Sequence, residues 1–496
     1  MREAGVLLHI SSLPSAGGIG TLGSAAYDFV DFLAAAGFRY WQVLPVGVTG
    51  YGDSPYQSAS AYAGNPYFID LDVLVKEGFL RAADLHGIDW GDNPSEVDYG
   101  KLFAGREEVL RKAAARFCAL GGDGGEEYIS FIQENAFWLD DFALFMTIKT
   151  LNGLKPLSEW SDPTLIRRDA GALAELRYAR VDDILFYKAS QFFFFRQWFA
   201  LRAYAERKGI KLIGDMPIYV ALDSAEVWSR PSDFLLTEEL SPIEVAGVPP
   251  DYFSETGQLW GNPLYNWDAI AADGYRWWGE RIKHAMRLYH KVRIDHFRGF
   301  SAYYAIPADN ADARGGRWCK GPGAALFESI ARQAPGADII AEDLGLLDDS
   351  VAELLAQTGF PGMKVLQFAF SGEEDNPYLP ANYTENCIVY TGTHDNNTAS
   401  AWFANLTEDE LECFSGYAES IKGSPAQVLI SLALSSPAAL AVIPMQDFLP
   451  PGKGARMNTP STLGQNWKWR MLPDTATKAL AKKIKRSLIA GGRAEK

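Results

Sequence analysis

Cysteine is scarce in this chain of 496 residues, which contains only Cys118, Cys319, Cys387 and Cys413. The four are widely separated, and they form neither a C-x-x-C pair nor a spacing with histidine that is typical of zinc sites. A disulfide framework and a structural zinc site are therefore not expected. We interpret the four side chains as buried thiols of a protein in a reducing compartment.

Long apolar runs and excess positive charge are also missing. No apolar stretch approaches the roughly 18 residues of a membrane-spanning helix. The first residues, MREAGVLLHISSLPS, lack a basic leader and a small-residue cleavage site. There are 46 Lys and Arg against 62 Asp and Glu, a formal net charge of -16, which repels phosphate backbones and anionic lipids. We therefore expect a cytoplasmic protein with no nucleic-acid or membrane partner.

Short apolar segments bounded by turn residues predict eight β-strands, at 4–10, 40–47, 210–218, 291–297, 337–345, 362–370, 387–395 and 440–447. Segments with helical periodicity separate them, and the first of these ends at a glycine. Eight strands that alternate with helices indicate a closed (β/α)8 barrel of the TIM type. With 48% hydrophobic residues, the chain can bury such a core.

The spacing of the strands predicts two large insertions in one catalytic barrel domain that spans 1–496. Residues 48–205, between strands two and three, are too many for one helix and should form mainly helical subdomains. They include a long helix at 182–209, in which we interpret Phe192 to Phe195 as packing residues. Residues 220–273, between strands three and four, should form a loop region that binds substrate. No C-terminal β-sandwich is expected.

The sequence GIGTLG, from Gly18 to Gly23, matches the dinucleotide-binding pattern G-x-G-x-x-G. In that motif the glycines directly follow a strand, and the next strand ends in an acidic residue. Here seven residues intervene after Ile10, and the next strand has no such acid. The match therefore gives little support to dinucleotide binding.

Polar residues gather where the predicted strands end. In KVRIDHFRGF, residues 291–300, strand alternation places Arg293 and Asp295 on the same face. One such pair alone could be a structural ion pair. Active sites of barrels lie at the C-terminal strand ends, so all such residues should converge on one mouth, where their repulsion argues against a purely structural role. The others are Asp215, His296, Glu342, Asp343, His394, Asp395, Gln446 and Asp447.

Two chemistries use a rim of this kind. Carboxylates with histidine could hold a divalent metal, or a pair of carboxylates could cleave a glycosidic bond. The chain has 14 Trp and 22 Tyr, several of them in loop-like stretches such as GYGDSPYQSASAYAGNPY and PPDYFSETGQLWGNPLYNW. Aromatic faces beside amides and carboxylates suit sugar rings. This composition favours glycoside chemistry without a metal or other cofactor.

Several long segments resemble the amylomaltases, or 4-α-glucanotransferases, which are relatives of the α-amylases. The resemblance covers nearly the whole chain, and its segments include LLHISSLPS, SPYQSASAYAGNPYFIDL, GDMPIYV, GVPPDYFSETGQLWGNPLYNW, RIDHFRGF, AEDLG, YTGTHDNNT, PMQD and RMNTPSTLGQNWKWR. Ser461 departs from the pattern, since glycine is expected there. Tyr62 also departs, since phenylalanine is usual at its position.

The resemblance implies an enzyme that moves α-1,4-glucan segments, including maltooligosaccharides, to the 4-hydroxyl of an acceptor glucan. It implies a retaining double displacement with Asp295 as nucleophile, Glu342 as acid/base and Asp395 as a third carboxylate. Arg293 should keep Asp295 ionised, and burial with a nearby anion should raise the pKa of Glu342. The implied substrate contacts are Arg293, His296, His394, Asp215, Tyr56, Asp251 and Trp260. The alternatives are an α-glucan hydrolase of the α-amylase type and a non-catalytic glycan-binding protein.

Overall fold

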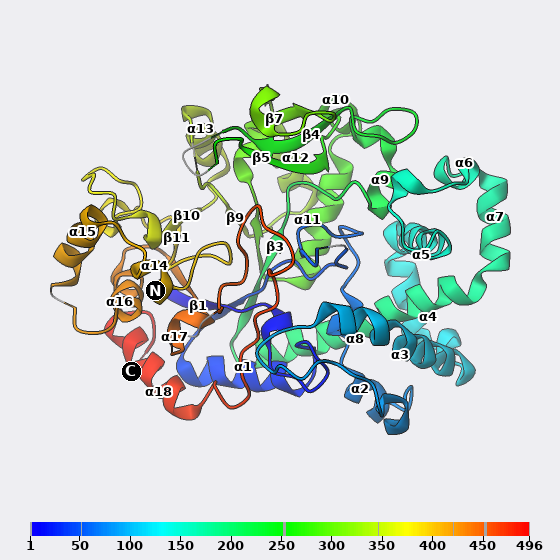
Figure 1. The fold of residues 1–496 in the computed structure, drawn as a ribbon, viewed down its shortest axis with the longest axis horizontal. Helices are drawn as coiled ribbons and strands as arrows, with labels where there is room; N and C mark the ends of the chain where they lie inside the picture. Colours follow the sequence, from blue (N-terminus) through cyan, green and yellow to red (C-terminus); the bar gives the residue numbers. More distant parts are fainter. Residues whose placement is uncertain are drawn as a thin grey trace.

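The computed structural model describes residues 2–50, 52–250, 254–345, 347–419, 421–450 and 454–495. Eight parallel strands form its centre, hydrogen-bonded in the order β10-β11-β12-β1-β2-β3-β6-β9 (Figure 1). Between the two end strands, the N–H of Ala341 donates to the carbonyl of Pro361 at 3.0 Å. The sheet is thus a nearly closed barrel, as predicted. Its strands are β1 (Glu3–Leu7), β2 (Tyr40–Gln42), β3 (Lys211–Met216), β6 (Lys291–Ile294), β9 (Ile339–Ala341), β10 (Gly362–Val365), β11 (Cys387–Tyr390) and β12 (Leu440–Pro444).

Each of the eight predicted segments overlaps a barrel strand, and every strand is shorter than predicted. The predicted strand at 291–297 ends at Ile294, and the one at 337–345 ends at Ala341. Asp295 and Glu342 are therefore the first residues beyond their strands. The apolar alternation continues into the loops, which is why the sequence pattern overestimated the length of these strands.

Helices cover the outside of the barrel. The first, α1 (Ser24–Ala36), ends at Gly37 with φ 87, as its glycine signal predicted. It packs against the last helix, α18 (Lys478–Ala490). The capping box of Thr407 and Glu410 begins α15 (Glu408–Ala418). The remaining helices of this layer are α11 (Arg276–Leu288), α12 (Ala324–Gln333), α13 (Asp349–Thr358), α14 (Ala399–Phe403), α16 (Pro425–Ser435) and α17 (Met445–Phe448).

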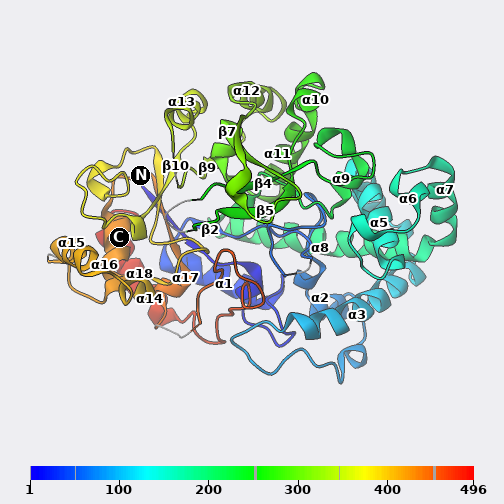
Figure 2. The same cartoon turned by 45° about the horizontal axis from the view of Figure 1, so that its top comes forward.

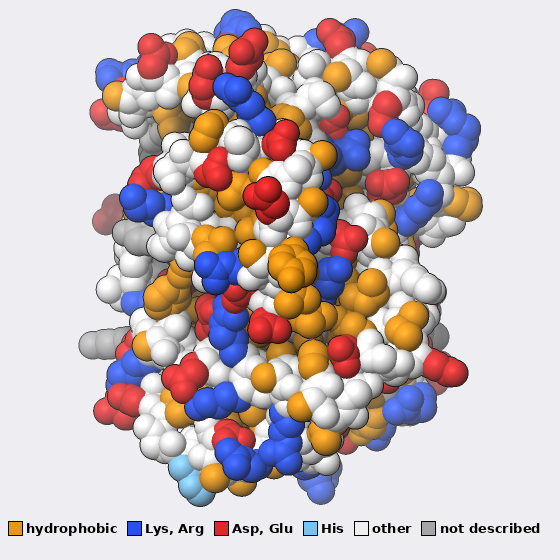
Figure 3. All heavy atoms as spheres, turned by 90° about the vertical axis from the view of Figure 1, so that its right-hand side faces the viewer, with side chains coloured by type: hydrophobic (Ala, Val, Ile, Leu, Met, Phe, Trp, Pro, Cys, Tyr) orange, Lys and Arg blue, Asp and Glu red, His pale blue; other side chains and the backbone are white. Residues whose placement is uncertain are grey.

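Among the described residues between β2 and β3, seven α-helices extend to one side of the barrel (Figures 1 and 2). They are α2 (Leu71–Lys76), α3 (Tyr99–Ala119), α4 (Glu126–Glu134), α5 (Ala136–Leu151), α6 (Pro163–Ile166), α7 (Ala170–Ala179) and α8 (Val181–Arg207). The long helix α8 is the one predicted from periodicity. Phe193 and Phe194 on α8 are 0% exposed, and Phe192 and Phe195 are also buried, which confirms their packing role. Figure 3 shows hydrophobic side chains gathered near the middle of this side of the molecule.

A second sheet lies beside the barrel mouth, where the sequence predicted only a loop region. Its four antiparallel strands have the order β5-β4-β7-β8. The strands β4 (Glu244–Val248) and β5 (Gln258–Pro263) precede β6, together with α9 (Ala225–Ser229) and α10 (Trp267–Ala272). The strands β7 (Ala302–Pro307) and β8 (Arg317–Lys320) follow β6. Figure 1 shows β4, β5 and β7 together above the barrel strands.

The cysteine prediction is only partly correct. All four thiols are free, but Cys387 alone is buried. Cys118, Cys319 and Cys413 are half-buried because they lie on elements at the periphery of the core. Within the described residues, no helix has the length and apolar character needed to cross a membrane. In that part of the chain α18 is the last element of secondary structure.

Candidate active site

A cavity of about 2400 Å³ opens at the C-terminal ends of the barrel strands. Eight of the ten site residues predicted from the sequence line it, namely Tyr56, Trp260, Arg293, Asp295, His296, Glu342, His394 and Asp395. Asp215 lies directly behind the wall, where its Oδ2 accepts a hydrogen bond of 2.8 Å from the hydroxyl of Tyr56. Asp251, the tenth, lies outside the described residues. The barrel therefore brings these strand ends together, as expected.

Arg293 connects two carboxylates. Its Nη1 lies 2.9 Å from Oδ1 of Asp295 and 2.8 Å from Oδ1 of Asp215. The side chains of Arg293 and Asp215 are 5% and 0% exposed, whereas that of Asp295 is 29% exposed. Burial alone would lower the pKa of Arg293, but Asp215 and Asp295 raise it well above its ordinary value. Arg293 is thus a fixed cation, and Asp295 is the carboxylate of this trio that reaches the cavity.

Glu342 is buried beside this charged group. Burial raises the pKa of its carboxyl to about 7, Arg293 opposes the shift, and Asp295 adds to it. Two backbone N–H groups donate to the carboxylate, that of His296 to Oε2 at 2.6 Å and that of Leu344 to Oε1 at 2.9 Å. These bonds orient Glu342 in the cavity wall. Near neutral pH the group can both give and take a proton.

His296 turns the chain immediately after Asp295. Its φ of 52 lies in the left-handed region, an uncommon conformation for a residue other than glycine and one that is often found at functional sites. Burial lowers the pKa of His296 to about 4, so the imidazole is neutral at neutral pH. Its Nε2 has no hydrogen-bond partner within the described residues. The ring of Trp260 meets it edge to face, with centroids 4.9 Å apart.

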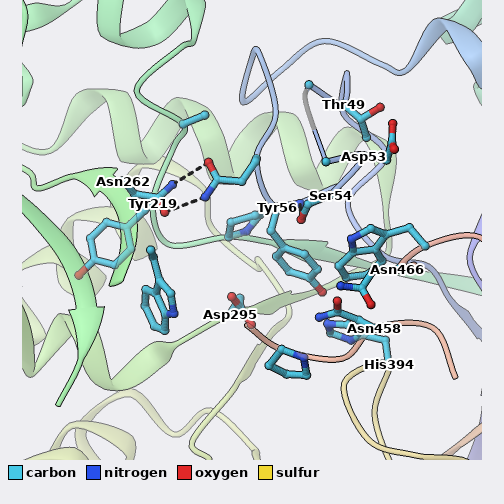
Figure 4. Close-up of a pocket in the computed structure, with 18 of the residues that line it drawn as sticks. Thr49, Asp53, Ser54, Tyr56, Tyr219, Asn262, Asp295, His394, Asn458 and Asn466 are labelled. Atoms are coloured by element: carbon cyan, nitrogen blue, oxygen red, sulfur yellow. Dashed lines mark hydrogen bonds between the residues drawn. The ribbon is translucent and has the colours of Figure 1, made fainter. Parts of the chain in front are cut away.

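The opposite wall carries stacked rings and the third carboxylate. The Tyr56 and His394 rings are stacked with centroids 5.1 Å apart, and the Trp467 ring lies 5.9 Å from each of them. The Nδ2 of Asn458 donates to Oδ1 of Asp395 at 2.6 Å, and Nε2 of His394 lies 3.5 Å from the same oxygen. Figure 4 shows Tyr56, His394, Asn458 and Asp295 around one space.

Three strand-end residues do not join this group, which corrects the prediction that all of them converge. Oδ1 of Asp343 accepts a hydrogen bond of 2.5 Å from the N–H of Met363. Asp447 accepts from the Thr391 hydroxyl at 2.6 Å and from the N–H of Ala399 at 2.8 Å. Gln446 donates to the carbonyl of Ala455. These side chains hold neighbouring backbone segments and do not line the main cavity.

The structure also adds residues that the sequence analysis did not select. Asn458 and Trp467 lie in the segment RMNTPSTLGQNWKWR. The sequence showed that this segment resembles the family, but it indicated no function for either residue. Gln57 and Asn262 join the two sequence insertions through amide hydrogen bonds of 3.0 and 3.4 Å (Figure 4). The only signal in the sequence was that amides and aromatic residues share these loops. Among the described residues, no cluster of three or more His, Cys, Asp or Glu side chains could hold a metal ion.

Carboxylates, neutral imidazole and aromatic faces around one open cavity define a barrel enzyme of carbohydrate chemistry. The family model described as 4-alpha-glucanotransferase matches residues 8–475. The chain belongs to this family of glycosyltransferase-type enzymes, which act on α-glucans.

Known proteins match this chain over almost its full length. The 4-alpha-glucanotransferase of Streptococcus pneumoniae serotype 4 is 47% identical, over 97% of this chain and 95% of that protein. That of Clostridium butyricum is 45% identical, over 98% of this chain and 100% of that protein. The solved amylomaltase from Streptococcus agalactiae, in complex with acarbose, superposes with a TM-score of 0.96 at 43% identity and covers 100% of both chains.

Proposed function

We propose that this enzyme transfers α-1,4-glucan segments to the 4-hydroxyl of an acceptor glucan by a retaining double displacement. One observation carries the proposal: Asp295, paired with Arg293, and Glu342, with a pKa raised to about 7, meet in one cavity. A retaining glycosidase mechanism needs an ionised nucleophile and a protonated acid on opposite sides of the scissile bond. The acarbose bound to the related amylomaltase supports an oligosaccharide as the occupant.

In the first step a carboxylate oxygen of Asp295 attacks the anomeric carbon of the donor glucan. The bond from that carbon to the bridging oxygen breaks, and Glu342 gives its proton to this oxygen, so that the leaving segment departs with a free 4-hydroxyl. Arg293 is also paired with Asp215, so its charge stays in place while Asp295 becomes an ester. The product is a covalent glucosyl-enzyme.

In the second step the ionised Glu342 removes the proton from the 4-hydroxyl of an acceptor glucan. The acceptor oxygen attacks the same anomeric carbon, and the ester bond to Asp295 breaks. Two inversions at one carbon retain the α configuration. The raised pKa of Glu342 suits both steps, because neither its acidic nor its basic form is strongly disfavoured near neutral pH.

The remaining polar groups would hold the reacting glucose. Asp395, oriented by Asn458, is placed to accept hydrogen bonds from ring hydroxyls, and the imidazole of His394 is beside it. The unpartnered Nε2 of His296 is a further contact for a hydroxyl. These hydrogen bonds would strengthen as positive charge develops on the sugar ring.

Transfer must prevail over hydrolysis. Water at ~55 M competes with an acceptor at ~1 mM, so equal rates already require about 6 kcal/mol of preference for the sugar. Binding of the acceptor and exclusion of water are the available sources. The aromatic faces of Tyr56 and Trp260 flank the carboxylates, and we propose them as platforms for the two glucans. Asp251 is proposed as a further contact from its place in the second insertion.

Incubation with maltotriose alone tests this function. Transfer yields glucose together with oligosaccharides longer than maltotriose, whereas an α-glucan hydrolase yields only glucose and maltose. Unchanged maltotriose would indicate a binding protein and would refute the proposal. The variant Asp295→Asn, which keeps the size of the side chain, serves as the inactive control.

A further inference from the structure

Trp318 is an exposed aromatic residue in the wall of the catalytic cavity. It lies on β8, the edge strand of the second sheet, opposite Tyr304 in the register of β7. The residue is 41% exposed, while Trp41, Trp198 and Trp228 in the core are 0% exposed. An exposed tryptophan in a cavity is a candidate contact for an apolar ligand face.

The ring of Trp318 is held in a fixed position. The guanidinium carbon of Arg298 lies 4.0 Å from the ring centroid, within the range of a cation–π interaction. Arg298 is in turn paired with Asp348, with 3.0 Å between Nη2 and Oδ2. The Tyr304 ring contacts Trp318 at a steep angle, with centroids 5.2 Å apart. A ring restrained in this way loses little conformational freedom when a ligand stacks on it.

A series of contacts connects Trp318 to the catalytic groups. Arg298 belongs to the short helix η7 (Phe297–Phe300), which directly follows His296. The N–H of His296 holds Glu342, the proposed proton donor. That donor acts on the bridging oxygen between the two sugars, and in the proposed mechanism Tyr56 and Asp395, in the opposite wall of the cavity, contact the glucose that becomes attached to Asp295. Trp318, which is connected to Glu342 through Arg298 and His296, is therefore assigned to the side of the departing or incoming glucan.

We propose that Trp318 is a stacking platform for a glucose unit of the acceptor beyond the first, so that it makes the enzyme favour longer acceptors. The inference rests on the proposed transferase function, but it concerns acceptor length and not the chemical step. The apolar face of a pyranose would lie on the ring, which Arg298 supports. Glucose as acceptor would occupy only the position next to Glu342 and would not reach Trp318.

The test uses α-maltotriosyl fluoride as donor, because its leaving group, fluoride, leaves the acceptor positions empty. The KM for glucose and the KM for maltotriose as acceptors are measured for the wild type and for Trp318→Ala. We expect the ratio of the maltotriose KM to the glucose KM to rise roughly five- to tenfold in the variant. Trp318→Phe, which keeps an aromatic face, should show a smaller rise. Tyr178→Ala, an 89% exposed tyrosine outside the cavity, is the control and should leave the ratio unchanged.

Two results would overturn the inference. Both leave the ratio of the two KM values unchanged in Trp318→Ala: in one neither KM changes, and in the other both rise by the same factor, which would mean that the variant disturbs the site next to Glu342. Failure of the proposed function looks different, since the wild-type enzyme would then release fluoride without elongating any acceptor. Thermal unfolding of each variant checks that the fold is retained, and Trp318→Phe alone decides the question if Trp318→Ala unfolds.

Discussion

The backbone N–H of His296 donates a hydrogen bond of 2.6 Å to Oε2 of Glu342. In making this contact His296 adopts the left-handed conformation, with a φ of 52. The bond favours the ionised carboxylate, whereas burial favours the protonated form and is the largest influence on its pKa. The turn after β6 therefore carries Asp295, the proposed nucleophile, and also positions Glu342, the proposed acid/base. Through the N–H of His296 it lowers the pKa of the Glu342 carboxyl.

The raised pKa of Glu342 predicts an alkaline limit to activity. Formation of the glucosyl-enzyme from maltotriose needs the protonated carboxyl, which predominates below the pKa of about 7 and is lost as the pH rises through that value. We expect kcat/KM for maltotriose to fall about tenfold for each pH unit above this point. The measurement is a pH profile of initial rates.

A donor with fluoride as leaving group supplies the control for this profile. Glu342→Gln should form the glucosyl-enzyme from maltotriose very slowly but retain a rapid first turnover of fluoride release from α-maltotriosyl fluoride, because the departure of fluoride needs little help from an acid. Both donors are compared in the first turnover, since the second step also needs Glu342, as a base. Equal losses on both donors would contradict an acid role for Glu342.

Removal of the Asp295 charge should lower the pKa of Glu342, because Asp295 is one of the groups that raise it. We expect Asp295→Asn to reduce turnover by several orders of magnitude and to shift the Glu342 titration to lower pH. The shift can be followed by NMR of labelled glutamate carboxyls. The control is Asp338→Asn, which changes an exposed carboxylate paired with Lys291 at the other end of β6. Near-normal turnover of Asp295→Asn would exclude Asp295 as nucleophile.

The barrel was predictable from the sequence because buried parallel strands appear as short apolar runs between turn residues. The second sheet was not, because β8, with Arg317 and Trp318 exposed, has no apolar pattern and pairs with a strand that only the fold brings near. Ser461 adopts φ 63, a conformation that favours glycine, so the turn expected from glycine persists with serine in this chain.

The carboxylates show where sequence reasoning about the site succeeds and fails. Glu342 and Asp343 both follow β9, yet only Glu342 lines the cavity. Asp343 turns away from the cavity and accepts a hydrogen bond from the N–H of Met363, whereas the adjacent residues His394 and Asp395 both line the cavity. A position at the C-terminal end of a strand therefore predicts that a residue lies near the mouth of the barrel, but it does not predict whether the side chain points into the cavity. Asn458 lies far along the sequence from Asp395, and only the structure brings them together.

Loss of the Trp260 ring should change the fate of the glucosyl-enzyme more than its formation. Trp260 packs edge to face against His296 and lines the cavity, where it would exclude water and support the incoming glucan. We expect Trp260→Ala to raise the ratio of hydrolysis to transfer roughly fivefold, since a lost sugar contact is worth about 1 kcal/mol. The ratio is measured in one incubation with maltotriose, in which new reducing ends report hydrolysis and longer oligosaccharides report transfer. The ratio for Trp260→Phe should lie between those of the wild type and Trp260→Ala. An unaltered ratio in Trp260→Ala would show that Trp260 does not select the acceptor.

The packing of α8 predicts a stability effect that is separate from catalysis. Phe194 is 0% exposed, and a Cβ atom added at Gly64 would come within 2.0 Å of its ring. Phe194→Ala should lower the free energy of unfolding by about 3–5 kcal/mol through loss of buried surface and a cavity. Gly64→Ala should also be destabilising, because the new methyl group overlaps the ring. In the double variant the methyl group enters space that the ring has left, so the combined loss should be smaller than the sum of the two single losses. Denaturant unfolding of the four proteins measures the coupling, and strictly additive losses would show that Gly64 and Phe194 do not compete for the same space.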